Sequence, residues 1–225
     1  MSSDTHRLAS TRLYFVVEAD APDALLDAAL AGGCDLLQLR DKQAGDDALL
    51  DAAERFRDAC DRHGALFVLN DRPELALQCG ADGVHVGQDD LPVDAVRRLV
   101  GPEMLIGLST HSPEQFAAGV RSEADYLSVG PIWETPTKAG RPATGLEFVR
   151  HAAAATAAKP WFAIGGIDTS NVGEVVAAGA ARGRRACDPR RGRPERGRGR
   201  AAHCARGRAC RVGRASVLAR RAPAR

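Results

Sequence analysis

The strongest constraint on the fold of this chain is a sevenfold alternation of short apolar runs with amphipathic stretches. The predicted strands are residues 13–17, 34–40, 65–70, 82–86, 104–109, 124–130 and 160–166. The predicted helices are 20–31, 46–62, from 73, 93–99, 113–120, 145–157 and from 169 or 170 to 179. Each strand is apolar throughout, which is typical of strands covered on both faces. The alternation therefore predicts a parallel sheet flanked by helices.

Two α/β architectures fit this alternation, and the polar residues separate them. Polar side chains follow nearly every apolar run, at the point where a parallel strand would end. An open, doubly wound sheet concentrates its site at one switch point, whereas a closed barrel builds its site from the ends of many strands. The sequence therefore predicts a (β/α)8 TIM barrel over residues 13–180, after a polar lead at 1–12.

The eighth strand and helix of that barrel are missing from the sequence. Residues 181–225 contain sixteen Arg against two acidic residues, which leaves 15 basic and 27 acidic side chains in the first 180 residues. The overall net charge of +2 therefore hides a basic tail on an acidic body. A strand needs apolar residues, so we expect this tail to be disordered and the edges of the first and seventh strands to be open.

A change of reading frame near residues 180–185 explains the composition of the tail. A GC-rich gene that encodes Asp-Ala-Asp-Asp-Pro gives Arg-Gly-Arg-Pro when it is read from the third base, which matches residues 191–194. The alternative is a genuine Arg/Gly-rich arm that binds nucleic acid without sequence specificity. With an eighth strand absent, we expect this polypeptide to fold poorly or to turn over weakly.

Cationic and amide side chains follow the second predicted strand. Gln38, Arg40 and Lys42 are two residues apart, so they lie on one face while the chain stays extended. Three donors at the mouth of a barrel suit a polyanion such as diphosphate. A solvated run of charges is the alternative.

Two carboxylates follow the third and fourth predicted strands. Asp71 and Asp90 from adjacent strand ends could hold one Mg²⁺, with its other positions left for water and phosphate oxygens. Asp71 could instead cap the helix that follows it, and Asp90 could belong to a plain turn. Together with the cationic run, the metal site is the better interpretation. We interpret His85 as a packed core residue.

The later strand ends carry hydrogen-bond donors and glycine. Ser109 has no base and acid at a spacing that would make it a nucleophile, so we expect it to hydrogen-bond a substrate. The long loop after the sixth strand is rich in donors that suit phosphate, and two glycines precede a helix start where backbone N–H groups can meet an anion. These residues are Thr135, Thr137, Lys138, Gly165 and Gly166.

Taken jointly, these motifs resemble those of the thiamine-phosphate synthase family. The resemblance runs from about residue 13 to residue 180, through "LQLRDK", "LNDRPELALQCGADGVHVGQDDLP", "GLSTHS", "SVGPIWETPTKAG" and "AIGGI". It implies a (β/α)8 barrel that joins 4-amino-2-methyl-5-hydroxymethylpyrimidine diphosphate to a thiazole phosphate, giving thiamine phosphate and diphosphate. A transferase of this kind needs no nucleophile from the protein.

The resemblance also implies a role for each matching residue. Asp71 and Asp90 would bind Mg²⁺, and Ser109 would touch the pyrimidine substrate. The pyrimidine diphosphate would be held by Gln38, Arg40, Lys42, Asn70 and Lys138. The thiazole phosphate would be held by Thr135, Thr137 and a glycine of Gly165-Gly166.

Two other functions remain open at this point. A thiazole tautomerase is a relative on the same barrel, and His111 keeps it in view, although an isomerase has no diphosphate to hold. A damaged, inactive synthase whose basic tail binds nucleic acid is the other. We expect small-molecule substrates, no membrane and no specific nucleic acid, and we leave a homo-oligomer open. The sequence starts without an apolar signal segment and has no C-x-x-C pair, so we expect a reduced, cytoplasmic enzyme.

Overall fold

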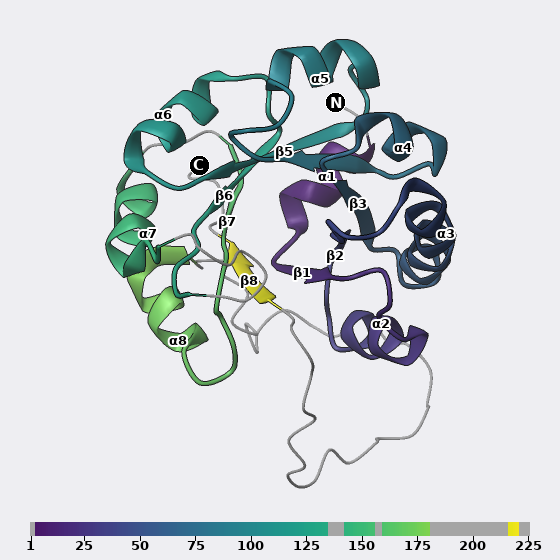
Figure 1. The fold of residues 1–225 in the computed structure, drawn as a ribbon. Coiled ribbons are helices and arrows are strands. Elements are labelled where there is room, and N and C mark those ends of the chain that lie inside the picture. Colours follow the sequence, from purple (N-terminus) through teal and green to yellow (C-terminus); the bar gives the residue numbers. More distant parts are fainter. Residues whose placement is uncertain (1–2, 135–141, 156–158, 181–215, 221–225) are drawn as a thin grey trace, which may run out of the picture.

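The computed structural model describes residues 3–134, 142–155, 159–180 and 216–220, and it forms a barrel of strands ringed by helices (Figure 1). The strands are β1 Leu13–Val17, β2 Leu36–Leu39, β3 Leu66–Asn70, β4 Gly83–Val86, β5 Leu105–Thr110, β6 Tyr126–Val129, β7 Trp161–Ala163 and β8 Ser216–Arg220. The helices are α1 Ser3–Ser10, α2 Asp23–Ala31, α3 Asp46–His63, α4 Pro73–Gln78, α5 Val93–Val100, α6 Pro113–Arg121, α7 Gly145–Ala154 and α8 Val172–Val175. A short π-helical turn, η2 Val176–Ala180, follows α8.

Strands β1 to β7 pair in parallel with their neighbours in chain order, which confirms the predicted α/β barrel. Strand β1 has the predicted bounds and β5 is shifted by one residue, while the other parallel strands are shorter than predicted. The last two helices also differ from the prediction. Helix α7 ends at Ala154, and α8 begins at Val172 after a turn at 168–171.

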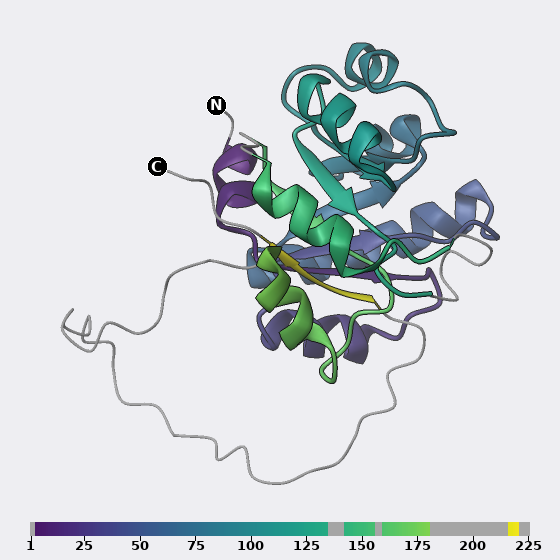
Figure 2. The same ribbon diagram turned by 90° about the vertical axis from the view of Figure 1, so that its left-hand side faces the viewer.

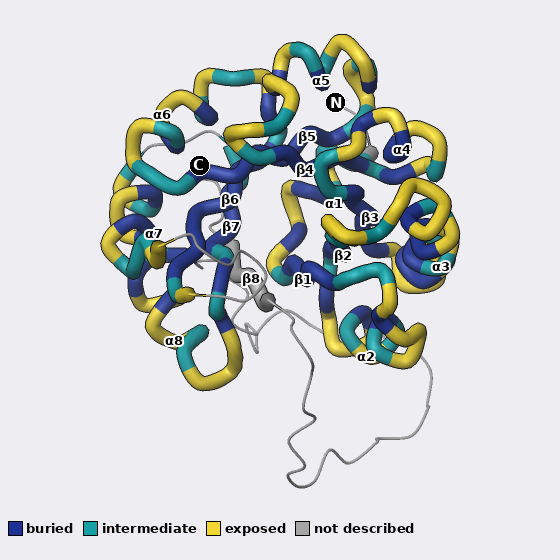
Figure 3. Tube along the Cα trace, viewed as in Figure 1, coloured by how far each residue is buried: buried dark blue, intermediate teal, exposed yellow. Residues whose placement is uncertain are grey.

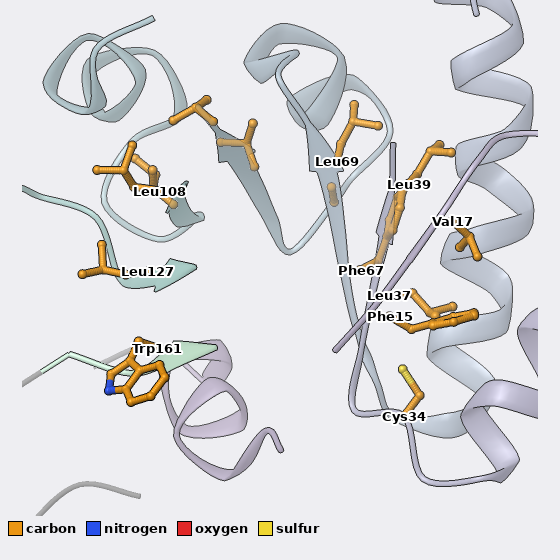
Figure 4. Packing of buried hydrophobic residues seen from close by; sticks show 14 of the residues in the cluster. Phe15, Val17, Cys34, Leu37, Leu39, Phe67, Leu69, Leu108, Leu127 and Trp161 are labelled. Atoms are coloured by element: carbon orange, nitrogen blue, oxygen red, sulfur yellow. The ribbon is translucent and has the colours of Figure 1, made fainter. Parts of the chain in front are cut away.

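The apolar strands bury side chains on both faces, and this produces two cores. The inner core fills the barrel and contains Leu8, Tyr14, Val16, Leu36, Leu66, Val68, Leu105, Tyr126 and Phe162. The outer core lies between the strands and the helices, and Figure 4 shows part of it, with Phe15 and Leu37 on one side and Leu127 and Trp161 on the other. Strands β1 to β7 are mostly buried while the outer faces of the helices are exposed (Figure 3). Burial on both faces is the reason that the strands lack alternation.

The edges of β1 and β7 are paired, so the prediction that they are open is wrong. Strand β8 lies between them and runs antiparallel to both, with Val16 opposite Ser216 and Ala163 opposite Ala219. It closes the barrel. Residues 216–220 therefore differ from the expected disorder, because they form the one apolar run of the tail and an open sheet edge offers them backbone partners. The rest of 181–225 lies outside the described residues.

Helix α1 covers one end of the barrel, although the sequence predicts only a polar lead there (Figure 2). Leu8 is 1% exposed and belongs to the inner core. The Arg7 Nη2 atom donates to the carbonyl oxygen of Ala65, just before β3, at 2.6 Å. The helix therefore lies at the amino-terminal ends of the strands, and it leaves the opposite end to the loops.

The predicted start of α6 is confirmed. Ser112 is the N-cap and its side chain accepts a hydrogen bond from the backbone N–H of Gln115 at 3.3 Å, while Pro113 occupies the first turn. Among the helices of the described residues, none is long and apolar enough to cross a membrane.

Two buried cysteines should resist alkylation in the folded protein. Burial raises the pKa of Cys34 and of Cys60 to about 12, so their thiolate forms are rare at neutral pH. We expect iodoacetamide at pH 8 to leave both unmodified in buffer and to label both in guanidinium chloride. Peptide mass spectrometry measures this, with the partly exposed Cys79 as the internal control. Complete labelling of Cys34 in buffer would contradict the described packing.

Candidate functional site

The predicted site residues that the structure describes lie at or near the carboxyl ends of the parallel strands, opposite the end that α1 covers. Gln38 is in β2, Asn70 ends β3, and Ser109 is the last residue but one of β5. Because parallel neighbours end at the same edge, the loops after β2, β3 and β4 converge there.

A lysine and two carboxylates come together after β2, β3 and β4. The Lys42 Nζ atom lies 2.9 Å from the Asp71 Oδ2 atom. The Asp90 carboxyl group lies close enough to Asp71 to affect its ionisation, and the Asp90 Oδ2 atom accepts the backbone N–H of Gly87 at 2.7 Å. The structure therefore brings Lys42, Asp71 and Asp90 into one cluster.

The backbone at Asp71 is unusual for a residue with a side chain. Its φ is 63°, in the left-handed region, where Asp and Asn are among the few tolerated non-glycine residues. The backbone N–H of Asp71 donates to the carbonyl oxygen of His85 at 2.9 Å, which fixes the turn against β4. The N-cap of α4 is Arg72, with no side-chain cap. Asp71 is therefore not the helix cap that its sequence position allows.

The electrostatics of the cluster favour a bound cation. Burial raises the pKa of Asp71 and the Asp90 carboxyl raises it further, while the Lys42 ammonium lowers it. A positive charge placed between the two carboxyl groups would favour the ionised form of Asp71. No third acidic, histidine or cysteine side chain joins them among the described residues. These two carboxylates fit a Mg²⁺ ion that takes its other ligands from water and substrate oxygens.

A second group of polar side chains is buried inside the barrel. The Gln38 Nε2 atom donates to the hydroxyl of Tyr14 at 2.5 Å, and this hydroxyl lies 3.4 Å from that of Tyr126. The Tyr126 hydroxyl lies 3.1 Å from His85 Nδ1, and His85 Nε2 lies 3.0 Å from Ser109 Oγ. Gln38 and Ser109, which come from strands on different sides of the barrel, are thus connected by hydrogen bonds.

This group contains residues that the sequence analysis missed. Tyr14, Tyr126 and Ser128 are each 1% exposed or less. Their positions in the sequence do not indicate that their side chains point into the barrel, because these strands are apolar on both faces. One signal was available: Gly107 lies beside His85 and Tyr126 in the sheet register. A glycine in the middle of a strand often marks a close approach of its neighbours.

Arg40 and Asn70 are placed by their positions at the ends of β2 and β3. Arg40 follows β2, and its positive charge lowers the pKa of Tyr14 against the larger, opposite effect of burial. Asn70 pairs with His85 in the register of β3 and β4. Both therefore lie next to the two groups above.

The two glycines after β7 have a packing role in the structure. Their φ values are 94° at Gly165 and 65° at Gly166. A Cβ atom at Gly165 would lie 2.5 Å from Cβ of Pro131, and one at Gly166 would lie 2.8 Å from Cβ of Trp133. The end of β7 therefore passes directly against residues 131–133. The prediction that these glycines also hold a phosphate stays a prediction.

The turn before α8 is held by hydrogen bonds to an acidic side chain of its own. The Asp168 carboxylate accepts the Ser170 backbone N–H at 2.7 Å and the Ser170 hydroxyl at 2.6 Å. Hydrogen bonding from Ser170 lowers the pKa of Asp168. The Asp168 carboxylate therefore already accepts the hydrogen bond of one backbone N–H group in this turn. Thr135, Thr137 and Lys138 lie outside the described residues.

His111 lines a different space from the two groups above. A cavity of about 690 Å³ lies beside α6 and α7, and its lining includes His111, Ser112, Thr144, Glu147 and His151. The His111 Nδ1 atom is hydrogen-bonded to the carbonyl oxygen of Gly130. Neither Lys42 nor either carboxylate of the cluster lines this cavity.

Comparison with known proteins gives one consistent family. A family model described as thiamine monophosphate synthase matches residues 13–183. The thiamine-phosphate synthase of Gloeobacter violaceus is 54% identical over 178 residues, which are 78% of this chain and 52% of that protein. The thiamine-phosphate synthase of Acidothermus cellulolyticus is 51% identical over 181 residues, or 78% of this chain and 85% of that protein.

A solved structure agrees with these relatives. The thiamine phosphate pyrophosphorylase from Pyrococcus furiosus superposes with a TM-score of 0.68 and 29% sequence identity, over 77% of this chain and 84% of that one. The chain spans about half the length of the Gloeobacter relative and most of the other two. The family match ends at residue 183, close to the predicted start of the basic tail.

Proposed function

This chain belongs to the thiamine monophosphate synthase family and is a transferase of that type, and on this premise we propose that it joins an aminopyrimidine diphosphate to a thiazole phosphate. The products would be thiamine phosphate and diphosphate. The observation that carries the proposal is the Lys42–Asp71–Asp90 cluster at the carboxyl ends of three adjacent strands. It offers one cation and two cation-binding carboxylates where a diphosphate would meet the barrel.

We assign the metal site to Asp71 and Asp90 and its ion to Mg²⁺. Carboxylate oxygens are the ligands that Mg²⁺ takes from proteins, commonly in pairs that leave room for phosphate oxygens. When bound, the ion would supply positive charge that stabilises the departing diphosphate. Lys42, which contacts Asp71 at 2.9 Å, would then be released toward the same diphosphate.

The remaining contacts divide between the two substrates. Arg40, Lys42 and Asn70 would hold the diphosphate, because guanidinium, ammonium and amide groups all donate to phosphate oxygens. Gln38 and Ser109, which are both 2% exposed, would hold the pyrimidine ring at the top of the inner core. Lys138 would join the diphosphate contacts, and Thr135, Thr137 and a glycine of Gly165-Gly166 would hold the thiazole phosphate, as their sequence positions predict.

The reaction that suits this set of residues is a dissociative substitution. The bond between the pyrimidine methylene carbon and the diphosphate oxygen breaks, and the oxygen keeps the electron pair. The positive charge left on the methylene is delocalised into the electron-rich aminopyrimidine, and the thiazole nitrogen then forms the new carbon–nitrogen bond. The site would supply donors and charges that stabilise the separating ions, so no side chain has to act as a nucleophile.

The two alternatives gain no support. A thiazole tautomerase would not need a cationic and carboxylate cluster for diphosphate, and the relatives compared above are named as synthases or pyrophosphorylases. Nucleic-acid binding by the tail would rest on residues that lie outside those described. We also propose that the enzyme works in the cytoplasm, on the basis of its isolated cysteines.

Release of diphosphate tests the proposed function directly. Purified protein, Mg²⁺ and both substrates should release diphosphate and form thiamine phosphate in equal amounts, measured by coupled phosphate detection and fluorescence of the oxidised product. Omission of either substrate, or addition of EDTA, should stop the release. Release that needs only the pyrimidine diphosphate would contradict coupling, and isomerisation of a thiazole carboxylate phosphate without release would favour the tautomerase.

A further inference from the structure

The hydrogen bonds inside the barrel have one direction of donation, from Gln38 toward His85, because each group has a limited number of protons to donate. An amide nitrogen can only donate, so the Gln38 Nε2 atom donates to Tyr14 and the Tyr14 hydroxyl accepts. Among the described residues, the only acceptor that the Tyr14 proton reaches is the hydroxyl of Tyr126 at 3.4 Å. The single proton of Tyr126 is then left for His85 Nδ1 at 3.1 Å.

This direction determines the protonation of the histidine ring. If Nδ1 of His85 accepts from Tyr126, the proton of the neutral ring is on Nε2. That N–H lies 3.0 Å from the Ser109 Oγ atom and 3.5 Å from the Ser128 Oγ atom, so its shorter hydrogen bond is a donation to Ser109. Burial raises the pKa of both Tyr14 and Tyr126, so both hydroxyls keep their protons. The three groups between Gln38 and Ser109, which are Tyr14, Tyr126 and His85, thus share one hydrogen-bonding direction.

Gly107 makes the contact between His85 and Tyr126 possible. These two residues lie on β4 and β6, on either side of β5, and both pair with Gly107 in the register. A Cβ atom at Gly107 would lie 2.3 Å from His85 Nδ1 and 2.3 Å from Cζ of Tyr126. Only glycine therefore leaves space for the two side chains to meet across the intervening strand.

We infer that Tyr126 is a positioning residue, which sets the Nε2–H tautomer of His85 and through it the hydrogen-bonding direction of Ser109. At the other end of the same chain of hydrogen bonds, Tyr14 holds the Gln38 amide nitrogen and turns the amide oxygen away from itself. Gln38 and Ser109 are the two groups assigned to the pyrimidine, so this role rests on the proposed function. Tyr126 is fully buried in the inner core. It would act on pyrimidine binding without touching the substrate.

The tautomer can be measured without any substrate. In protein labelled with 15N-histidine, long-range 1H–15N spectra should show His85 with its proton on Nε2 and a hydrogen-bonded acceptor at Nδ1. A His85→Gln variant assigns the signals. In a Tyr126→Phe variant, which keeps the ring and removes the hydroxyl, the Nδ1 signal should shift toward that of an unbonded nitrogen or the tautomers should mix. A proton on Nδ1 in the parent protein, or an unchanged His85 in the variant, would overturn the inference.

Kinetics supply a readout that depends on the proposed function. Tyr126→Phe should raise KM for the pyrimidine diphosphate about tenfold, the effect of one lost hydrogen bond, and leave KM for the thiazole phosphate unchanged. Phe162→Leu is the matched control, because Phe162 packs edge-on against both Tyr14 and Tyr126 without a hydrogen bond. It should lower the melting temperature and leave the tautomer and both KM values unchanged. Equal changes in both KM values would indicate a structural effect alone.

The two measurements separate the two failures. If the protein couples no substrates but Tyr126→Phe alters the His85 tautomer, the proposed function fails and the role of Tyr126 in positioning His85 stands. If the protein makes thiamine phosphate and neither the tautomer nor KM for the pyrimidine responds to Tyr126→Phe, the inference fails alone.

Discussion

An Asp71→Asn variant should lose about 100-fold or more in kcat/KM for Mg²⁺-dependent coupling. The substitution removes one of two carboxylates and the partner of Lys42, while it keeps the size of the side chain. Asn also tolerates the left-handed φ of 63° at this position, so the turn after β3 should stay intact. The measurement is initial diphosphate release at several Mg²⁺ concentrations.

The chain offers a matched control for this variant. Asp46 is an exposed carboxylate at the start of α3, and it contacts Arg72, the residue next to Asp71, at 2.7 Å. Asp46→Asn removes the same charge from the same region without touching the cluster. It should leave kcat/KM and its Mg²⁺ dependence within about twofold, since such a surface ion pair contributes little. Equal activity in both variants would remove the basis for the metal assignment.

Asp71 also shows what sequence can predict of a site and what it cannot. Its place after an apolar run is enough to predict that it lies with Lys42 and Asp90 at one end of the barrel, because parallel strands end together. Whether it capped α4 or faced the cluster depended on one dihedral angle, which neighbouring residues set. The direct contact between Lys42 and Asp71 likewise depends on loop conformation.

Tyr126 and Leu8 were missed for a different reason. Strands that are apolar on both faces carry no alternation, so the sequence gives no indication of which side chains fill the barrel. Tyr126 is one of these, and only the packing of β4 and β6 across Gly107 joins it to His85. Leu8 is the one large apolar residue in the polar stretch 2–12, and it is buried because the end of the barrel offers it an apolar surface.

The composition of the tail led to an incorrect prediction of its effect on the sheet, namely that the edges of the first and seventh strands would be open. Residues 216–220 pair with β1 and β7 because backbone groups at an open edge accept any chain segment that can extend. Such pairing depends little on side chains, so composition alone underestimates it. The direction of β8 matters for function, because β8 runs antiparallel to β1 and β7 and so brings its first residue, not its last, toward the site.

A chain with the reading frame restored after Ala180 should have a kcat/KM for thiazole phosphate at least about tenfold higher than this chain. In the register of β1, Ser216 at the start of β8 lies beside Val16, near the carboxyl ends of the parallel strands. This chain therefore brings the beginning of its eighth strand to the site, whereas a parallel strand would bring its end and the following loop. We expect the end of a parallel eighth strand to help to bind the thiazole phosphate, because the loops at the carboxyl ends of the strands build the site of such a barrel.

A chain that ends at Ala180 is the control for this comparison, because it removes β8 and leaves the backbone groups of β1 and β7 unpaired. Melting temperature should rise in the order truncated chain, present chain and restored chain, since each step pairs the sheet edges more completely. KM for the pyrimidine diphosphate should stay nearly constant between the last two, because Gln38, Lys42 and Asp71 lie on or after β2 and β3, which do not pair with β8. Equal kcat/KM values for the present and restored chains would mean that an antiparallel eighth strand supports binding of the thiazole phosphate as well as a parallel one. That result would contradict the prediction that the frame change reduces activity.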